Sequence, residues 1–398
     1  MLAALLAKRG VRVALFSKAK RPPIIVGESL VPAIIPFLRR LGIEDEVAGY
    51  SIWKGGATFV LNSEQRLNVR FDDVRGARTT YSYNVPRDRF DASLLQAAER
   101  AGARIISSPA LLARVADSDR VALEEPSIAA AGDVFDGQQP DWIIDAAGRS
   151  RQIARLLDLP TIEGERHDAA LHAHVEGVEV EIDGNVHTDR LEHGWAWRIP
   201  LPGRVSVGLI VDSDYLRTFG ETTEEQYDNY LHADPVIRDW ARPAHRITPV
   251  VRYSNYQLRT MRGVGANWAL VGDAFGFIDP VFSSGMLIAL ESADELATAL
   301  LDGSPDALRT YEREFLHKLE CWQRTAEYFY SGQLLTLFKV GDMVRGTFWG
   351  RLLDFHFRKH MPRLFTGEGA TNRYSQWLLG FMVQHGLYRQ DPAELRIN

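Results

Sequence analysis

The chain has 398 residues, enough for two or three domains of roughly 150 residues each, which excludes a small binding module. Hydrophobic residues make up 45% and charged residues 25%, a composition that excludes disordered and collagen-like chains. The 46 basic residues against 52 acidic ones give a net charge of −6, so we expect no nucleic-acid partner. The single cysteine, Cys321, excludes a disulfide-stapled fold and predicts a cytoplasmic location.

The first residues predict a βαβ unit that lacks its first strand. Residues 1–9 predict the end of a helix that stops at Gly10, and residues 11–16 predict a short buried strand. No glycine-rich turn, which would hold the pyrophosphate of a dinucleotide, comes before this helix. The apolar run at the N-terminus is too short to cross a membrane, and its basic residues follow the run, so we expect no membrane segment.

The remaining elements divide the chain into three parts. Strands and helices alternate up to a buried strand at residues 141–148, short alternating segments predict an antiparallel sheet, and a buried strand at 267–271 then leads to a long helix near Gly285. Beyond residue 304 the chain is helical and rich in aromatic residues, among them Trp349, Phe355 and Phe357. We therefore predict a discontinuous cofactor domain (1–160 and 262–303), a substrate-sheet domain (161–261) and a C-terminal helical region (304–398).

The segment from Val271 to Gly285 carries the most specific motif. Asp273 follows a predicted strand, and its carboxylate could accept a hydrogen bond from a ribitol or ribose hydroxyl. The turn then presents bare amides at the start of the Gly285 helix, which suit an electron-rich ring edge or an anion. The alternative is a capped turn in which Ser283 or Ser284 is the helix N-cap.

Two other patterns have both a structural and a chemical interpretation. Trp195 and Trp197 lie on one face of a strand, where a buried aromatic ladder is a common packing solution. Lys54 is flanked by Trp53 and a glycine pair, which favours partial burial with a lowered pKa, although most lone lysines are solvated. The histidines at 167, 172 and 174 lack a metal-ligand pattern and are interpreted as structural or surface residues.

Four stretches together carry a family resemblance: residues 27–32, 85–91, 195–200 and 272–285. On these motifs the chain resembles the FAD-dependent monooxygenase superfamily and, within it, the flavin-dependent halogenases that act on phenols and pyrroles. The tryptophan-x-tryptophan-x-isoleucine-proline stretch that starts at Trp195 is the part that separates halogenases from flavin hydroxylases. The resemblance extends to about Tyr330. It implies an α/β, glutathione-reductase-like FAD-binding fold without its N-terminal strand and glycine-rich loop, an antiparallel substrate sheet and a helical C-terminal region.

The resemblance also implies roles for individual residues. It implies no metal site. The FAD-contacting residues would be Ser17, Arg87, Gly272, Asp273, Gly285 and Met286, the halide would lie at Ser284 and Gly285, and the catalytic residues would be Lys54, Trp195 and Trp197.

The implied activity is FAD-dependent halogenation. A separate flavin reductase would supply reduced FAD, which forms a flavin hydroperoxide that chloride or bromide attacks. Lys54 would hold the resulting hypohalous species for an electron-rich aromatic substrate, either free or bound to a carrier protein. Phe282 stands where tryptophan-ring halogenases carry a glutamate, which disfavours free tryptophan as the substrate.

Two departures from the family pattern leave alternatives open. Met1 falls inside the helix that follows the phosphate-binding turn, and Ser17 replaces the acidic residue that usually binds the adenosine ribose. Either the true start lies upstream or the chain has lost flavin binding, and residues 1–398 alone are expected to bind FAD weakly. The rival functions are a flavin hydroxylase or geranylgeranyl-reductase-like oxidoreductase, and an inactive homologue that serves as a scaffold.

Overall fold

The computed structural model describes all residues except 19–23, 63, 255–256, 345–359 and 388–389. Its α-helices are α1 (Leu2–Ala7), α2 (Ile35–Leu41), α3 (Glu44–Ala48), α4 (Arg87–Arg100), α5 (Glu125–Ala131), α6 (Gln152–Leu156), α7 (Ser213–Arg217), α8 (Thr223–Ala233), α9 (Arg238–Ala241), α10 (Gly285–Asp302), α11 (Pro305–Tyr330), α12 (Gln333–Val344), α14 (Arg363–Thr366) and α15 (Arg373–His385). Its strands are β1 (Ala14–Phe16), β2 (Ile52–Lys54), β3 (Gly56–Val60), β4 (Arg66–Arg70), β5 (Ser82–Asn84), β6 (Arg104–Ile106), β7 (Leu112–Arg114), β8 (Val121–Leu123), β9 (Ile143–Asp145), β10 (Thr161–Glu163), β11 (Asp168–Glu176), β12 (Val186–Leu191), β13 (Gly194–Leu201), β14 (Arg204–Asp212), β15 (His245–Arg246), β16 (Val251–Ser254), β17 (Leu258–Thr260), β18 (Trp268–Leu270) and β19 (Gly276–Phe277).

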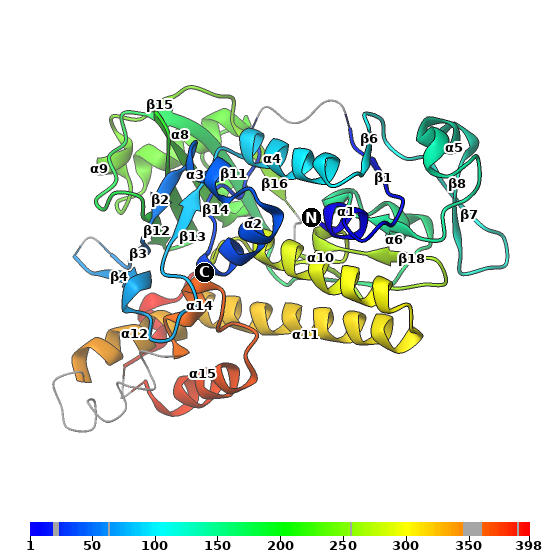
Figure 1. Ribbon diagram of the computed structural model, residues 1–398. Coiled ribbons are helices and arrows are strands. Elements are labelled where there is room, and N and C mark those ends of the chain that lie inside the picture. The colour runs from blue at the N-terminus through cyan, green and yellow to red at the C-terminus, as the bar shows by residue number, and fades with distance from the viewer. Residues whose placement is uncertain (19–23, 63, 255–256, 345–359, 388–389) are drawn as a thin grey trace.

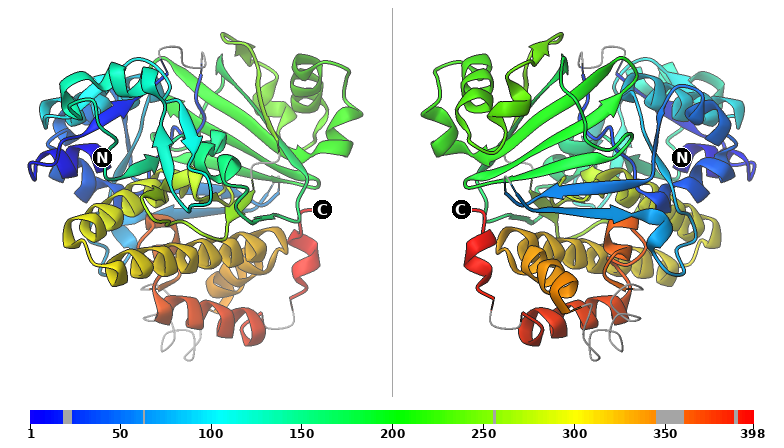
Figure 2. Two further views of the ribbon diagram at one scale, coloured as in Figure 1. Left: turned by 90° about the vertical axis from the view of Figure 1, so that its right-hand side faces the viewer. Right: turned by 90° about the vertical axis from the view of Figure 1, so that its left-hand side faces the viewer.

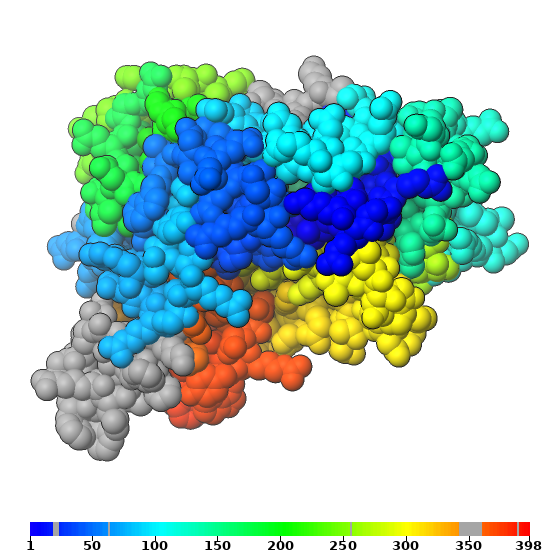
Figure 3. Space-filling view, in the orientation of Figure 1, coloured from blue at the N-terminus to red at the C-terminus, as the bar shows by residue number. Residues whose placement is uncertain are grey.

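Short parallel strands and helices form the end of the molecule that contains the N-terminus (Figure 1). Strand β1 pairs with β6, and β9 pairs with β18, both in parallel. Parallel pairing is expected where helices connect successive strands. Helix α1 contacts both α4 and α10, and on the face shown in Figure 3 the N-terminal residues lie between the α4 residues (cyan) and those of α10 and α11 (yellow). This layer confirms the predicted α/β part of the fold.

A large sheet forms the second part, as predicted. Its strand order is β15-β11-β14-β13-β12-β3-β4, with β16 beside β11. All pairs are antiparallel except that of β12 with β3. Because β3 and β4 come from residues before 161, the sheet extends beyond the predicted range 161–261, and the proposed domain division stays a prediction.

The two faces of the large sheet bury different side chains. Alternation along β13 sends Trp195, Trp197 and Ile199 into the main core, whereas Ala196 packs in a second core with Leu209 and residues of α8 and α9. Figure 2 shows the long strands of this sheet side-on, with α8 and α9 on one face. The face with the tryptophans is the one directed toward the rest of the molecule.

The C-terminal region is helical, as predicted. Helix α11 begins after Ser304, whose side chain accepts a hydrogen bond from the amide of Ala307, and its buried face includes Phe315, Trp322 and Phe329. The predicted aromatic residues at 349, 355 and 357 lie outside the described residues. None of the helices in the described part of the chain is both long enough and apolar enough to cross a membrane.

Candidate active site

A loop of residues 26–31 brings the predicted site residues together. It runs beside β5, because the amide of Leu30 donates to the carbonyl of Tyr83 (3.0 Å) and the amide of Val85 donates to the carbonyl of Glu28 (2.7 Å). Strand β2, which carries Lys54 at its end, pairs with the other edge of β5. Backbone hydrogen bonds therefore hold loop 26–31 along one edge of β5, and the strand that carries Lys54 lies along the other edge.

Lys54 reaches across β5 and is enclosed. Its Nζ donates to the hydroxyl of Ser29 (2.7 Å) and to the carbonyl of Leu30 (2.9 Å), and only 2% of the residue is exposed. Among the described residues no carboxylate forms an ion pair with it, so burial alone lowers the pKa of Lys54 to about 7. Trp53, expected to shield it, is 57% exposed. The predicted burial is confirmed, but loop 26–31 provides it.

Trp195 and Trp197 are buried, with ring centroids 5.7 Å apart. The Trp197 indole lies across Gly208, where a Cβ atom would come within 2.1 Å of the ring. Its Nε1 donates to the hydroxyl of Ser206 (3.3 Å), while Nε1 of Trp195 donates to the hydroxyl of Tyr330 (3.0 Å). Protein groups thus satisfy both indole N–H donors, and a catalytic role for either tryptophan stays a prediction.

A buried carboxyl group, which the sequence analysis did not assign, continues this network. The Tyr330 hydroxyl donates to Oδ2 of Asp279 (2.9 Å), which also accepts from Nε2 of Gln257 (3.2 Å). The amide of Val281 donates to Oδ1 (2.9 Å). Burial raises the pKa of Asp279 to about 7. The only sequence signal was an aspartate directly before a proline in the motif, and its partner Tyr330 comes from the distant helix α11.

Asp273 lies in the turn after β18, as predicted. Gly272 before it has φ +59°, and a Cβ atom there would lie 3.2 Å from that of Ala289 on α10. Burial raises the pKa of Asp273 to about 6, against the opposing charges of Arg87 and Arg149. No hydrogen bond to this carboxylate comes from the described residues. It is therefore available to accept hydrogen bonds from a ligand.

The turn before α10 presents open amides. Ser284 occupies the N-cap position, but its side chain makes no capping hydrogen bond, and Ser283 has a left-handed φ of +55°. A Cβ atom at Gly285 would lie 3.0 Å from the Phe277 ring. Because the Ser284 side chain makes no capping hydrogen bond, the alternative of a turn capped by this serine is not observed. The amides of Gly285 and Met286, with the nearby Asp273 turn, fit the electron-rich ring edge and hydroxyl groups at the flavin end of FAD.

Arg87 supports loop 26–31 from the start of α4. Its guanidinium donates to the carbonyl of Val26 and pairs with Asp91 (Nε–Oδ1, 3.1 Å). Gly27 has φ +94°, and a Cβ atom there would lie 2.9 Å from Arg87. Ser17 follows β1 and is partly buried. Contacts of Arg87 and Ser17 with FAD stay predictions.

Two of the three predicted structural or surface histidines are buried, and one is exposed. His167 is exposed, whereas His174 is 5% and His172 0% exposed. The described residues include no group of three metal-ligating side chains. His172 and His174 are therefore interior residues of β11.

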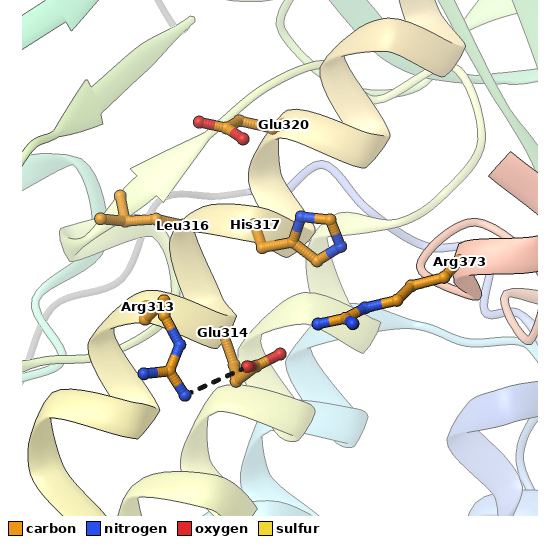
Figure 4. Close-up of a pocket in the computed structure, with 6 residues that line it drawn as sticks. All are labelled: Arg313, Glu314, Leu316, His317, Glu320 and Arg373. Atoms are coloured by element: carbon orange, nitrogen blue, oxygen red, sulfur yellow. Dashed lines mark hydrogen bonds and ion pairs between the residues drawn. The ribbon is translucent and has the colours of Figure 1, made fainter. Parts of the chain in front are cut away.

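A separate hollow lies on the surface of α11, away from these residues. It is lined by charged side chains of α11 and by Arg373 at the start of α15 (Figure 4). Arg313 and Glu314 form an ion pair at its edge (3.5 Å). None of the predicted site residues lines it.

Comparisons with known proteins agree with this geometry. The family model described as tryptophan halogenase matches residues 56–333. The tryptophan 2-halogenase of Chondromyces crocatus is 30% identical over 73% of this chain and 56% of its own length, so the chain spans just over half of that relative. The 1H-pyrrole-2-carbonyl-[peptidyl-carrier protein] chlorinase of Pseudomonas fluorescens is 23% identical over 86% of this chain and 83% of its own.

Among solved structures, the chain is similar to the myxobacterial chondrochloren halogenase CndH, described as a variant of FAD-dependent halogenases. The TM-score is 0.71 and the identity 25%, with 83% of this chain and 79% of the other covered. The flavin-dependent brominase Bmp2 is 18% identical, with a TM-score of 0.76 over 98% of this chain and 96% of that chain, a likeness that shows the fold alone.

Proposed function

Because this chain belongs to the tryptophan halogenase family, we propose that it is an FAD-dependent halogenase that transfers chlorine or bromine to an electron-rich aromatic ring. One observation carries the proposal. Lys54 is an enclosed amine that has no carboxylate partner among the described residues and is held by Ser29 and Leu30 of loop 26–31. A lysine placed in this way is costly for stability, and such groups cluster at functional sites.

The cofactor would bind at the turn before α10. The carboxylate of Asp273 would accept hydrogen bonds from hydroxyl groups, and the amides of Gly285 and Met286 would face the ring edge. Ser284 and Gly285 would hold the halide. When bound, reduced by a separate flavin reductase and reoxidised by molecular oxygen, FAD would supply the oxidation of chloride or bromide to a hypohalous acid. The lone cysteine, which is free and buried, supports a cytoplasmic setting.

Lys54 would capture the hypohalous acid. With a pKa of about 7, much of its amine is unprotonated at neutral pH and carries a nucleophilic lone pair. Attack on the halogen forms an N–halogen bond and breaks the O–halogen bond, and the departing hydroxide takes an amine proton to leave as water. An aromatic carbon then attacks the halogen, and the amine nitrogen recovers a proton as the ring loses its own.

The substrate class follows from the residue before the serine pair. Phe282 packs against Trp322 and Phe329, with ring centroids 6.2 and 5.8 Å away. This apolar contact offers no charge to stabilise a cationic intermediate on a weakly activated ring. The substrate is therefore a phenol or a pyrrole, free or bound to a carrier protein, and not free tryptophan.

The test is a halogenation assay with a matched lysine control. Wild-type protein, a flavin reductase, FAD, NADH and oxygen are incubated with a phenol in chloride or bromide, and the products are analysed by mass spectrometry. Lys54→Ala should lose at least about 100-fold in halogenated product while flavin reoxidation continues, because one group is removed after the oxidant is formed. Lys318→Ala, which removes a partly buried lysine that pairs with Glu291 and Glu295, should keep the activity of the folded enzyme.

Two results would contradict the proposal. Undiminished halogenation by Lys54→Ala would remove the role of the amine. A product that gains oxygen, independent of the halide, would identify a hydroxylase instead.

A further inference from the structure

His172 is a buried polar residue without a partner. It lies near the middle of β11 with 0% exposure, and neither Nδ1 nor Nε2 has a hydrogen-bond partner among the described residues. An unsatisfied buried polar group costs about 1–3 kcal/mol. Its neighbour His174 differs, because its Nε2 bonds Glu28 (2.8 Å) and its Nδ1 accepts from Arg204 (3.1 Å). Of these two histidines of β11, only His172 has unused hydrogen-bonding capacity.

Aromatic rings flank His172 on two sides. Trp197 and Tyr253 each have a ring centroid 6.0 Å from the imidazole, and the Tyr253 ring is inclined by only 20° to it. Gly208 lies opposite His172 in the sheet register, and the Trp197 indole lies across this glycine. Tyr253 is only partly buried, whereas Trp197 is 4% exposed, so Tyr253 is the ring of the two that lies nearer to solvent. Flat, apolar walls with one polar group suit an aromatic ring that carries one hydrogen-bonding substituent.

His172 faces the same loop as the reactive lysine. On the same face of β11, His174 bonds Glu28, and the next residue, Ser29, accepts the hydrogen bond from Lys54. The charge of Glu28 also acts on His172. A ring bound at His172 would therefore lie on the side of the sheet that is directed toward loop 26–31.

The chemistry of a neutral imidazole suits this position. Burial lowers the pKa of His172 to about 4, against the charge of Glu28, so the ring is uncharged at neutral pH. One nitrogen then accepts a hydrogen bond and the other donates one. Accepting a hydrogen bond from a ring hydroxyl or a pyrrole N–H increases the electron density of the ring, which favours attack by the ring on an electrophilic halogen.

We propose that His172 determines substrate specificity by accepting a hydrogen bond from the hydroxyl or N–H group of an aromatic substrate bound between Trp197 and Tyr253. This inference rests on the proposed halogenase function. It adds that the substrate must carry such a donor, and that its O-methyl or N-methyl derivative is rejected.

His187 provides the matched control. It is also fully buried with two unpartnered ring nitrogens. It pairs in register with Arg198, whereas His172 shares its face with Trp197, so the two histidines lie on opposite faces of the same sheet. Within the described residues no aromatic ring stacks on His187. Burial without a partner is thus common to both histidines, and the aromatic neighbours and loop 26–31 distinguish His172.

The experiment compares binding of 4-propylphenol and 4-propylanisole by isothermal titration calorimetry. Wild type should bind the phenol at least about tenfold more tightly than the ether, because the ether cannot donate a hydrogen bond. His172→Phe should bind both equally. His172→Asn, which restores an acceptor, should recover part of the preference, and His187→Phe should keep it. A preference that survives in His172→Phe, or a wild type that shows none, overturns the inference.

Failure of the inference and failure of the proposed function give different results. If flavin-loaded wild type halogenates 4-propylphenol but His172→Phe keeps the phenol preference, the inference is wrong and the halogenase function stands. If flavin-loaded wild type yields no halogenated product from phenols or pyrroles, the proposed function itself is wrong.

Discussion

Lys54 is a fully buried lysine and Lys318 a partly buried one, and their surroundings are opposite. Lys318 of α11 lies 3.3 Å from a carboxylate oxygen of Glu291 and also bonds Glu295, both on α10. Burial lowers its pKa, yet these two charges outweigh burial and raise it overall. Lys54 has only neutral acceptors, and burial lowers its pKa to about 7. The pairing of Lys318 joins α10 and α11, whereas Lys54, with no such charges beside it, has a pKa lowered to about 7 by burial.

The largest expected effect is a pH dependence of the free energy of unfolding that arises from Lys54. Its pKa is about 7 in the folded state and about 10.5 in the unfolded state, so the unfolded state binds more protons between these values. The free energy of unfolding should therefore rise with pH through this window, by roughly 4 kcal/mol relative to Lys54→Met. Urea unfolding of both proteins from pH 6.5 to 10.5 measures the difference. A constant difference between the two curves would contradict the assigned pKa.

Replacing Lys318 should change the free energy of unfolding by a smaller amount, and with the opposite sign to that expected for Lys54→Met. Lys318→Met leaves Glu291 and Glu295 as like charges without their cation, and should lower the free energy of unfolding at pH 7 by about 2 kcal/mol. Lys54→Met should raise it at pH 6.5, where the wild-type amine is mostly charged. Thermal unfolding of the two variants tests the signs. If both variants were destabilised equally, the distinction between the two lysines would fail.

The smallest expected effect concerns Asp279, a buried carboxyl group whose pKa, like that of Lys54, is shifted to about 7 by burial. Asp279 is buried and forms no ion pair with a described residue, and Tyr330 donates a hydrogen bond to it. Its pKa of about 7 lies above the unfolded value, so it contributes stability at low pH that is lost as pH rises from about 4 to about 7. Tyr330→Phe should cost about 1 kcal/mol at pH 8, where the carboxylate is charged, and less at pH 5.

Tyr311→Phe is the control for this prediction. Its hydroxyl donates to the backbone carbonyl of Leu270, which does not titrate, so its cost should be the same at both pH values. An equal cost at pH 5 and pH 8 in Tyr330→Phe, measured by urea unfolding, would show that Asp279 does not titrate in this range.

The sequence was informative where local pattern determines structure. Alternation predicted the buried tryptophans of β13, and the strand and turn around Asp273 predicted a carboxylate that could accept hydrogen bonds and open amides before Gly285. The FAD-binding fold and the family followed from motifs of this kind.

The contacts that tune the site come from segments distant in sequence, and pattern could not predict them. Trp53 stood next to Lys54 and was expected to cover it, but Ser29 and Leu30 do so across β5. The interior position of His172 depends on the register of β11 with β14. Likewise, the partner of Asp279 is Tyr330 of α11, 51 residues away.

The most direct test of the central claim is the titration of the Lys54 amine. Protein labelled with ¹³C and ¹⁵N in lysine is titrated by NMR, with Lys54→Met and Lys318→Met used to assign the two side-chain signals. The Lys54 signal should titrate with a midpoint near pH 7, because burial disfavours its charge, while Lys318 stays protonated through that range. A Lys54 midpoint above pH 10 would show an ordinary charged lysine and would contradict the account.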